Sequence, residues 1–226
     1  MNYKIALIKG DGIGPEVVGE AVKVMDAIGA KFGHTFEYVD VLMGGCAIDA
    51  VGKSYPEGTA EKCKECDAVL LGAVGGPKWG HSTDPDKRPE TALLSIRKDL
   101  GLYANLRPAA LRPALAEACP LKKETADRGI DLMIVRELTG GIYFGKRERY
   151  ATEDRGEEAA DRMAYSEKEV ERIGRRAFEL ARLRGKKLAS VDKANVLETS
   201  RLWRQVMHKL AEEYSDVEYE DVLVDN

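Results

Sequence analysis

Apolar segments separated by glycine-rich turns dominate the first part of the chain. An apolar run over residues 3–8 leads into the glycine turn 9–15, behind which apolar residues recur at helical spacing from Val17 to Ile28. Two further apolar strands are predicted at 36–43 and 68–72, with a short helix between them beginning near Pro56. Strands that alternate with helices indicate a mostly parallel sheet covered by helices on both faces.

The remainder of the chain continues this alternation. The tetrad Ser166-Glu167-Lys168-Glu169 is a capping box and therefore predicts the start of a helix. The stretch 151–162 is too densely charged to pack inside a domain, so we expect a solvated arm or loop there. The other predicted elements are a helix over 90–100, a strand over 103–108, a helical stretch around 110–128, a strand over 131–136, a helix over 166–184, a strand over 187–192, a helix over 197–214 and a strand over 217–225.

The composition excludes several classes of protein. The 226 residues contain 35 Lys and Arg against 39 Asp and Glu, a net charge of −4 that argues against a nucleic-acid or anionic-membrane surface. No apolar run approaches the roughly 18 residues that span a bilayer, and the first residues lack a signal-peptide cleavage site, so a cytoplasmic location is expected. The four cysteines are interpreted as reduced thiols, because the single C-x-x-C at 63–66 has no second ligand pair for zinc.

Glycine-rich segments follow two of the predicted strands. The turn at 10–15 does not match the dinucleotide fingerprint G-x-G-x-x-G, because Pro15 stands where the third glycine belongs. A tight strand-to-helix turn and a ligand role are about equally compatible with it. Residues 73–89 are rich in Gly and Pro and follow a strand's carboxyl end, which is where open α/β sheets bind ligands.

The helix after this loop carries an unusual stripe. Glu90, Leu93, Leu94 and Arg97 have spacings of three, four and seven, so they share one face. A carboxylate, two leucines and a guanidinium would suit a site that holds both an apolar group and an anion.

Two more arginines stand at the ends of predicted strands. Arg107 precedes Pro108, and Arg136 directly follows the apolar run 132–135. A guanidinium grips a carboxylate with two parallel hydrogen bonds, so together with Arg97 these residues could neutralise a dicarboxylate. The alternative for each one singly is a surface ion pair.

Three further residues could carry proton or metal chemistry. Lys193 follows Asp192 at the end of a strand, where partial burial beside other cations would make its amine a usable base. Tyr143 is the second candidate proton carrier. Asp225 ends the last apolar run and suits a hard cation, although one carboxylate is not a complete metal site.

Several segments together resemble the β-decarboxylating dehydrogenases of the isocitrate/isopropylmalate dehydrogenase family. The matching segments, in chain order, are GDGIGPE (10–16), LLGAVGGPKW (70–79), PETALLSIRKDLGLYANLRP (89–108), VRELTGGIYFGKRER (135–149), DKANVLETSRLW (192–203) and VLVDN (222–226). The resemblance implies that family's α/β fold, with residues 1–100 as the N-terminal half of a nucleotide-binding domain. Residues 101–226 would form most of a substrate and dimerisation domain, with a dimerisation arm at about 141–162.

The resemblance also implies roles for the candidate residues. Arg97, Arg107 and Arg136 would bind the two carboxylates of the substrate, Tyr143 and Lys193 would transfer protons, and Asp225 would bind both Mg²⁺ or Mn²⁺ and substrate. Leu93 and Leu94 replace a serine typical of isocitrate-specific relatives, which favours 3-isopropylmalate as the substrate. NAD would lie over the loop and contact Gly75, Gly76, Pro77, Lys78, Trp79 and Glu90.

The resemblance implies a homodimer whose active site is shared between subunits. The family's chains continue beyond a segment like 222–226 with two more metal-binding aspartates and a glycine-rich adenosine loop, so we expect no turnover from these 226 residues alone. Two alternatives remain: a non-catalytic dimerisation fragment, and a related enzyme acting on isocitrate or tartrate.

Overall fold

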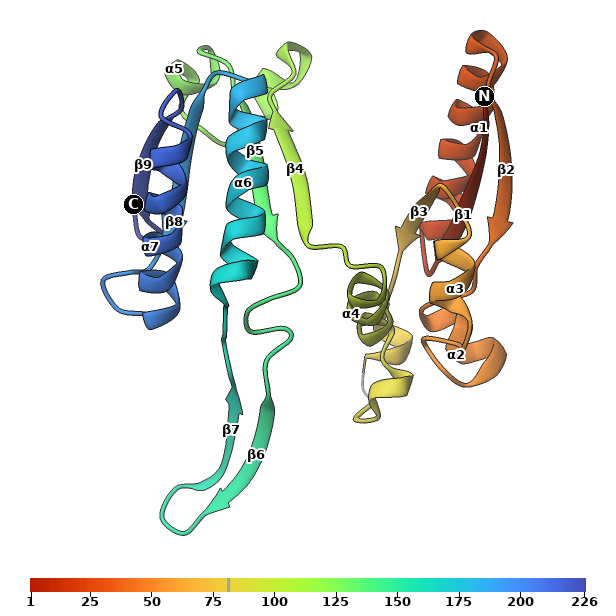
Figure 1. The fold of residues 1–226 in the computed structure, drawn as a ribbon. Helices are drawn as coiled ribbons and strands as arrows, with labels where there is room; N and C mark the ends of the chain where they lie inside the picture. The colour runs from red at the N-terminus through yellow and green to blue at the C-terminus, as the bar shows by residue number, and fades with distance from the viewer. Residues whose placement is uncertain (81) are drawn as a thin grey trace. The chain divides into compact units, whose positions relative to one another are not determined.

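The computed structural model describes residues 1–80 and 82–226 and divides the chain into two compact units, Met1–Gly101 and Leu102–Asn226 (Figure 1). Residue 81, in the predicted loop 73–89, lies outside the described residues. Among those described, no helix combines the length and apolar character needed to cross a membrane.

Unit 1 is built around a three-stranded parallel sheet. Strand β1 (Asn2–Gly10) lies between β2 (Thr35–Asp40) and β3 (Ala68–Ala73). Gly10 ends β1 with a φ of 71°, and a Cβ there would lie 1.9 Å from the Ala73 carbonyl oxygen, so only glycine permits this approach. The helices of the unit are α1 (Gly14–Phe32), α2 (Gly45–Val51), α3 (Thr59–Lys64) and α4 (Pro89–Asp99), with 3₁₀ turns η1 (Pro77–Trp79) and η2 (Pro85–Lys87).

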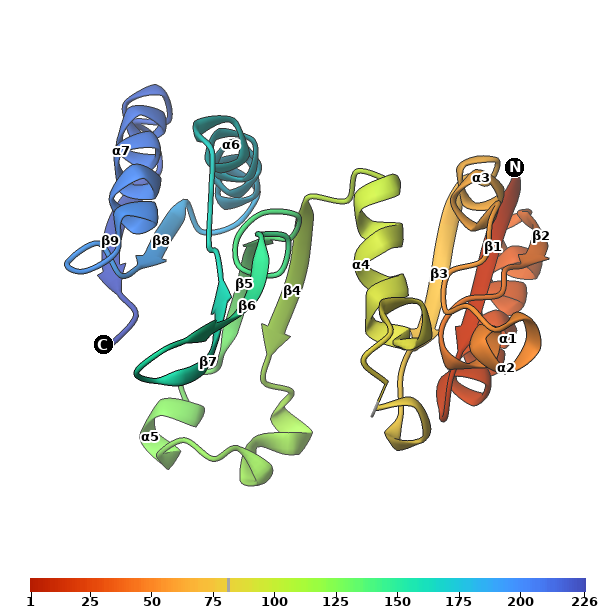
Figure 2. The ribbon, with the colours of Figure 1, turned by 90° about the horizontal axis from the view of Figure 1, so that it is seen from below.

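Helices cover both faces of this sheet. Ile5 and Leu7 of β1 pack with Val18 of α1, while Ala6 and Ile8 contribute to a cluster with residues of α3 and α4. Figure 2 shows α1 and α4 on opposite sides of the strands. Alternate residues of β1 therefore pack into two cores, one on each face of the sheet, and the sequence pattern predicted helices on both faces.

Unit 2 contains three strand pairs and two long helices, and two of the pairs pack near the helices. Strands β4 (Ala104–Ala110) and β5 (Asp131–Glu137) are antiparallel, whereas β8 (Lys187–Asp192) and β9 (Glu218–Leu223) are parallel. Helix α6 (Glu167–Leu183) begins with the predicted Ser166 capping box and packs on α7 (Glu198–Glu213). Phe178 of α6 is fully buried and stacks on Tyr214, with ring centroids 4.9 Å apart. This aromatic stack is the centre of the second core.

One segment of unit 2 differs from the sequence prediction, and another has the solvated, arm-like form that was expected. The stretch 110–128 is not a continuous helix and holds only the 3₁₀ turn η3 (Pro113–Ala118) and the four-residue α5 (Lys123–Ala126). Proline lacks a backbone N–H, so Pro113 and Pro120 interrupt any helix here. The charged stretch forms an antiparallel hairpin of β6 (Arg147–Thr152) and β7 (Gly156–Asp161), which projects from the unit with mostly exposed side chains (Figure 1).

Candidate active site

The two strand arginines share one face of the β4–β5 pair. Arg107 lies opposite Ile134, and Arg136 lies two residues further along β5, which makes it the diagonal neighbour of Arg107. The other face, with Met133 and Val135, is more buried, on the side of β5 that meets α6. Both guanidinium groups are thus presented together on an open face, as binding an anion requires.

Tyr143 lies beside Arg136 in a turn fixed by glycines. The guanidinium carbon of Arg136 is 5.7 Å from the centroid of the Tyr143 ring, within the range of a cation–π contact. Gly141, with a φ of 80°, leaves no room for a side chain, because a Cβ there would lie 2.3 Å from the Tyr165 hydroxyl. Its amide also donates to the Ala164 carbonyl at 2.9 Å. The turn therefore holds the half-exposed phenol at one place on the surface of unit 2.

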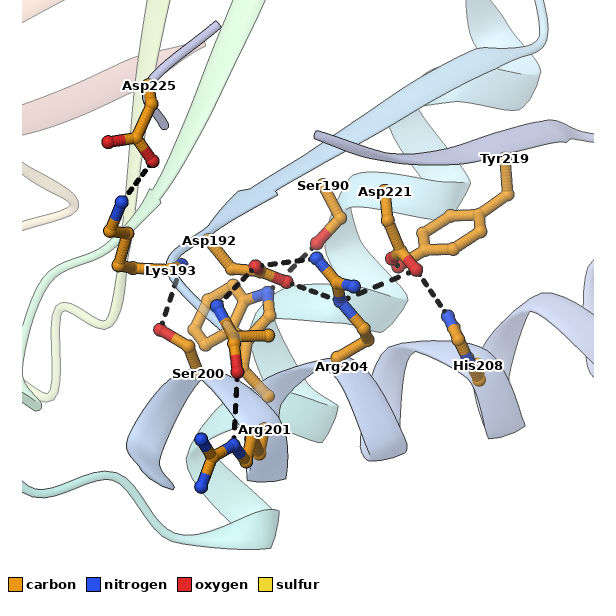
Figure 3. A network of polar contacts seen from close by, with 12 residues as sticks. Ser190, Asp192, Lys193, Ser200, Arg201, Arg204, His208, Tyr219, Asp221 and Asp225 are labelled. Carbon is orange, nitrogen blue, oxygen red and sulfur yellow. Dashed lines mark hydrogen bonds and ion pairs between the residues drawn. The ribbon is translucent and has the colours of Figure 1, made fainter. Parts of the chain in front are cut away.

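Lys193 and Asp225 form an ion pair. The ammonium of Lys193 donates to Asp225 Oδ2, and this bond holds the pKa of the Asp225 carboxyl below its usual value. The sequence led us to expect cations beside Lys193, and that expectation was wrong for this contact. The two strands end side by side, so the residues that follow them bring a carboxylate to the amine. Figure 3 shows the pair at the edge of a larger polar network.

The predicted cofactor loop is anchored by Asp11, which sequence reasoning did not single out. Its buried carboxylate accepts backbone N–H groups from Gly45 and Cys46 at 2.7 Å and from Gly75 at 2.8 Å. One side chain from the turn after β1 thereby ties the start of α2 to the loop after β3. An aspartate between two glycines was the only signal in the sequence.

Other residues of the loop contact α2 and α4. Lys78 Nζ and Trp79 Nε1 donate to Asp49 at 2.7 and 3.2 Å. These polar atoms are therefore engaged within unit 1. Gly75 adopts a φ of 102°, and a Cβ there would lie 2.8 Å from Glu90 Oε1, so the Glu90 carboxylate lies against the Gly75 backbone.

The stripe on α4 is only partly a free surface. Ala92 and Ile96 form the buried side of the helix, and Leu93 packs partly against the same core. Leu94 and Arg97 are half-buried and Glu90 is exposed. The stripe predicted from spacing lies on one helix, with Leu93 at the edge of the core.

A divalent cation fits Asp225 as one ligand of several. Carboxylate oxygen is the donor that Mg²⁺ and Mn²⁺ prefer, and Asp225 is half-exposed. Across residues 1–80 and 82–226, no group of three or more His, Cys, Asp or Glu side chains could hold a metal ion. The described residues therefore provide Asp225 as one metal ligand but not a complete set of ligands.

The profile of the isocitrate/isopropylmalate dehydrogenase family matches residues 4–226. The chain belongs to this family. It is 54% identical over 226 residues to the 3-isopropylmalate dehydrogenase of Nitratidesulfovibrio vulgaris and 56% identical over 225 residues to that of Moorella thermoacetica. The match covers nearly all of this chain but only 63% and 62% of those proteins. The chain thus spans about three fifths of the length of these members of the isocitrate/isopropylmalate dehydrogenase family.

Solved structures of the family agree with the fold. An isocitrate dehydrogenase from Methylococcus capsulatus matches 99% of this chain, and 61% of its own, with a TM-score of 0.81 and 31% identity. A β-decarboxylating dehydrogenase from Thermococcus kodakarensis matches 99% of this chain, and 58% of its own, with a TM-score of 0.69 and 35% identity. The α/β fold expected from the motifs is confirmed.

Proposed function

We propose that the chain forms part of an NAD-dependent dehydrogenase that oxidises and decarboxylates 3-isopropylmalate to 4-methyl-2-oxopentanoate (2-oxoisocaproate), a step of leucine biosynthesis. The observation that carries the proposal is the identity of 54% along the whole chain with a 3-isopropylmalate dehydrogenase. Leu93 and Leu94 support the same substrate, because two adjacent aliphatic side chains suit an isopropyl group and offer an isocitrate carboxylate no hydrogen bond.

The arginines would bind the two carboxylates of the substrate. Arg107 and Arg136 lie on one open strand face as diagonal neighbours, which suits one carboxylate held by two guanidinium groups. Arg97 would contribute a third positive charge. Their combined effect would be to orient the hydroxyl carbon and to raise the local concentration of the dianion.

Lys193 and Tyr143 would transfer the protons. Lys193, with its amine in the neutral form, would accept the hydroxyl proton while the hydrogen on the same carbon leaves as hydride. After loss of CO₂, Tyr143 would donate a proton to the carbon that carries the electron pair. Arg136, whose guanidinium lies over the Tyr143 ring, would hold this phenol beside the bound carboxylate.

NAD would supply the hydride acceptor, and Mg²⁺ or Mn²⁺ on Asp225 would supply positive charge for the substrate oxygen. The proposed contacts for NAD are Gly75, Gly76, Pro77, Lys78, Trp79 and Glu90. Asp11 supports this assignment, because it fixes the backbone at Gly75 next to the Glu90 carboxylate.

We infer that the cytoplasmic protein is a homodimer joined through the β6–β7 hairpin, whose exposed strand edges can pair with another chain. Analytical ultracentrifugation of the chain, with and without residues 147–161, tests this assignment. A dimer that persists without the hairpin would contradict it.

Substrate specificity tests the proposed reaction. Residues 1–226 would be continued by the remaining C-terminal part of the N. vulgaris 3-isopropylmalate dehydrogenase, and NADH formation would be measured with 3-isopropylmalate, isocitrate and tartrate in the presence of Mg²⁺. We expect kcat/KM to be about tenfold or more higher for 3-isopropylmalate, a discrimination within reach of one apolar pocket.

A pair of variants makes this test specific to the leucines. Leu93→Ser with Leu94→Ser should reduce the preference for 3-isopropylmalate, whereas Leu102→Ser, just beyond α4, should keep it. The M. capsulatus relative named an isocitrate dehydrogenase makes isocitrate the second candidate substrate. A higher kcat/KM for isocitrate or tartrate would overturn the proposal.

A further inference from the structure

A buried carboxylate lies one residue before Lys193. The side chain of Asp192, at the end of β8, is 2% exposed. It accepts two hydrogen bonds from Arg204 of α7, from Nε at 2.9 Å and from Nη2 at 2.8 Å (Figure 3). A buried carboxylate without a partner is strongly unfavourable, and the planar guanidinium fork satisfies both of its oxygens.

Asp192 also organises the turn that carries Lys193. Its Oδ1 accepts the backbone N–H of Ala194 at 2.9 Å, while the N–H of Lys193 donates to Ser200 Oγ at 3.1 Å. The Lys193 carbonyl in turn accepts the N–H of Leu197 at 2.9 Å. The backbone on both sides of Lys193 is therefore bonded to Asp192 or to α7.

Arg204 contacts the neighbouring strand as well. Its Nε lies 3.4 Å from Asp221 Oδ2 on β9, and the same carboxylate oxygen lies 2.7 Å from His208 Nε2. Burial alone would raise the pKa of the Asp221 carboxyl, but bonds from Tyr219 and His208 and the charge of Arg204 hold that pKa below its usual value. A charged Asp221 keeps Arg204 attached to β9.

This connection has a geometric consequence for the proposed catalytic pair. Asp192 pairs in register with Leu223, so Lys193 and Asp225 follow the two strands at the same end. One guanidinium from α7 thus contacts both strands just before the residues that form the Lys193–Asp225 ion pair. We propose that Arg204 is a positioning residue, which sets the turn after Asp192 so that the Lys193 amine reaches Asp225.

The inference rests on the proposed function only for the role of Lys193 as a proton carrier, and the contact can be tested without any substrate. A water-soluble carbodiimide activates a carboxylate, and a neighbouring amine then displaces the urea to form an amide bond. Mass spectrometry would measure the Lys193–Asp225 cross-link within single copies of the 226-residue chain, taken from molecules that carry no link to a second copy. Lys187 and Glu218, 2.9 Å apart at the other end of the same strand pair, form the internal standard.

We expect Arg204→Met to lower the ratio of the Lys193–Asp225 link to the Lys187–Glu218 link by about fivefold, which is typical of coupling within one polar network. Arg204→Lys should recover part of this ratio, because it keeps the charge but loses the fork. Arg182→Met is the matched control, since it removes a different arginine–aspartate pair of unit 2, with Asp216.

Two results would overturn the inference. An unchanged ratio would show that Lys193 reaches Asp225 without Arg204. A parallel loss of both links would show that Arg204 holds the strand pair as a whole. If Arg204→Met does not fold, as judged by circular dichroism, the ratio is taken from Arg204→Lys, which should fall below that of Arg182→Met. The cross-link ratio does not depend on turnover, so it tests the role of Arg204 even if the proposed function is wrong.

Discussion

Asp11→Asn is the most informative single change in unit 1. The aspartate carboxylate accepts three backbone N–H groups: Oδ2 binds those of Gly45 and Gly75, and Oδ1 binds that of Cys46. An asparagine side chain has almost the same shape but only one accepting oxygen. Whichever way the amide turns, its NH₂ group faces at least one N–H donor.

The expected cost follows from this count. If the amide oxygen takes the place of Oδ2, the N–H groups of Gly45 and Gly75 keep their acceptor, and the N–H of Cys46 loses its acceptor. A buried donor left unsatisfied costs about 1–3 kcal/mol, and the remaining bonds weaken because the acceptor is no longer charged. We therefore expect Asp11→Asn to lower the free energy of unfolding of unit 1 by about 2–4 kcal/mol.

Urea unfolding followed by Trp79 fluorescence measures this loss, with Trp203→Phe as the background so that only unit 1 reports. Trp79 is a suitable probe because its ring packs on Gly45, next to the Asp11 contact. The matched control is Asp67→Asn, an exposed carboxylate that accepts one backbone N–H, from Lys4 at 2.8 Å. An amide oxygen can keep that single bond, so a change within about 0.5 kcal/mol is expected. Equal effects of the two variants would refute the role given to Asp11.

Three further changes test the fold. Phe178→Ala, at a fully buried ring, should cost about 3–5 kcal/mol in urea unfolding, and a loss below about 1 kcal/mol would contradict the position of the second core. Gly141→Ala should lower the melting temperature, because its φ of 80° is strained for alanine by about 1–2 kcal/mol and its Cβ would meet the Tyr165 hydroxyl; an unchanged melting temperature would show that the turn adapts. Arg182 and Lys186 hold the pKa of Asp216 at about 2, below its ordinary 3.8, so this ion pair stabilises the fold above about pH 4 and is lost as the pH falls toward 2. Asp216→Asn should therefore be less stable than wild type at pH 6, and the difference should be much smaller at pH 2, so a gap that is the same at both pH values would argue against the pairing.

Features that depend on neighbouring residues could be predicted from the sequence. The apolar run before Lys9, the glycine turn and Pro15 are sufficient to place β1 and α1, because each requirement is met within a few residues. The capping box at Ser166 is equally local, and the structure contains both of its hydrogen bonds. The prolines within 110–128 are also a local signal, but the prediction of a helical stretch there gave too little weight to their helix-breaking effect.

Contacts between distant segments could not be predicted in this way. The N–H groups bound by Asp11 lie 34 to 64 residues further along the chain, and nothing near Asp11 indicates them. The carboxylate partner of Lys193 lies 32 residues away, just after β9, and nothing near Lys193 in the sequence indicates it. Arg204 and Asp192 lie on different elements, so their separation in the sequence does not indicate a contact. The contact forms only because α7 packs against β8.

The proton-carrying role of Lys193 is the central claim about chemistry, and one kinetic comparison tests it most directly. In the chain continued by the C-terminal part of the N. vulgaris relative, kcat with 3-isopropylmalate, NAD and Mg²⁺ would be measured for Lys193→Met and Lys187→Met. Loss of a general base costs about 10²–10⁴-fold, so we expect a decrease of that size for Lys193→Met and none for Lys187→Met. Similar values of kcat for the two variants would contradict the account.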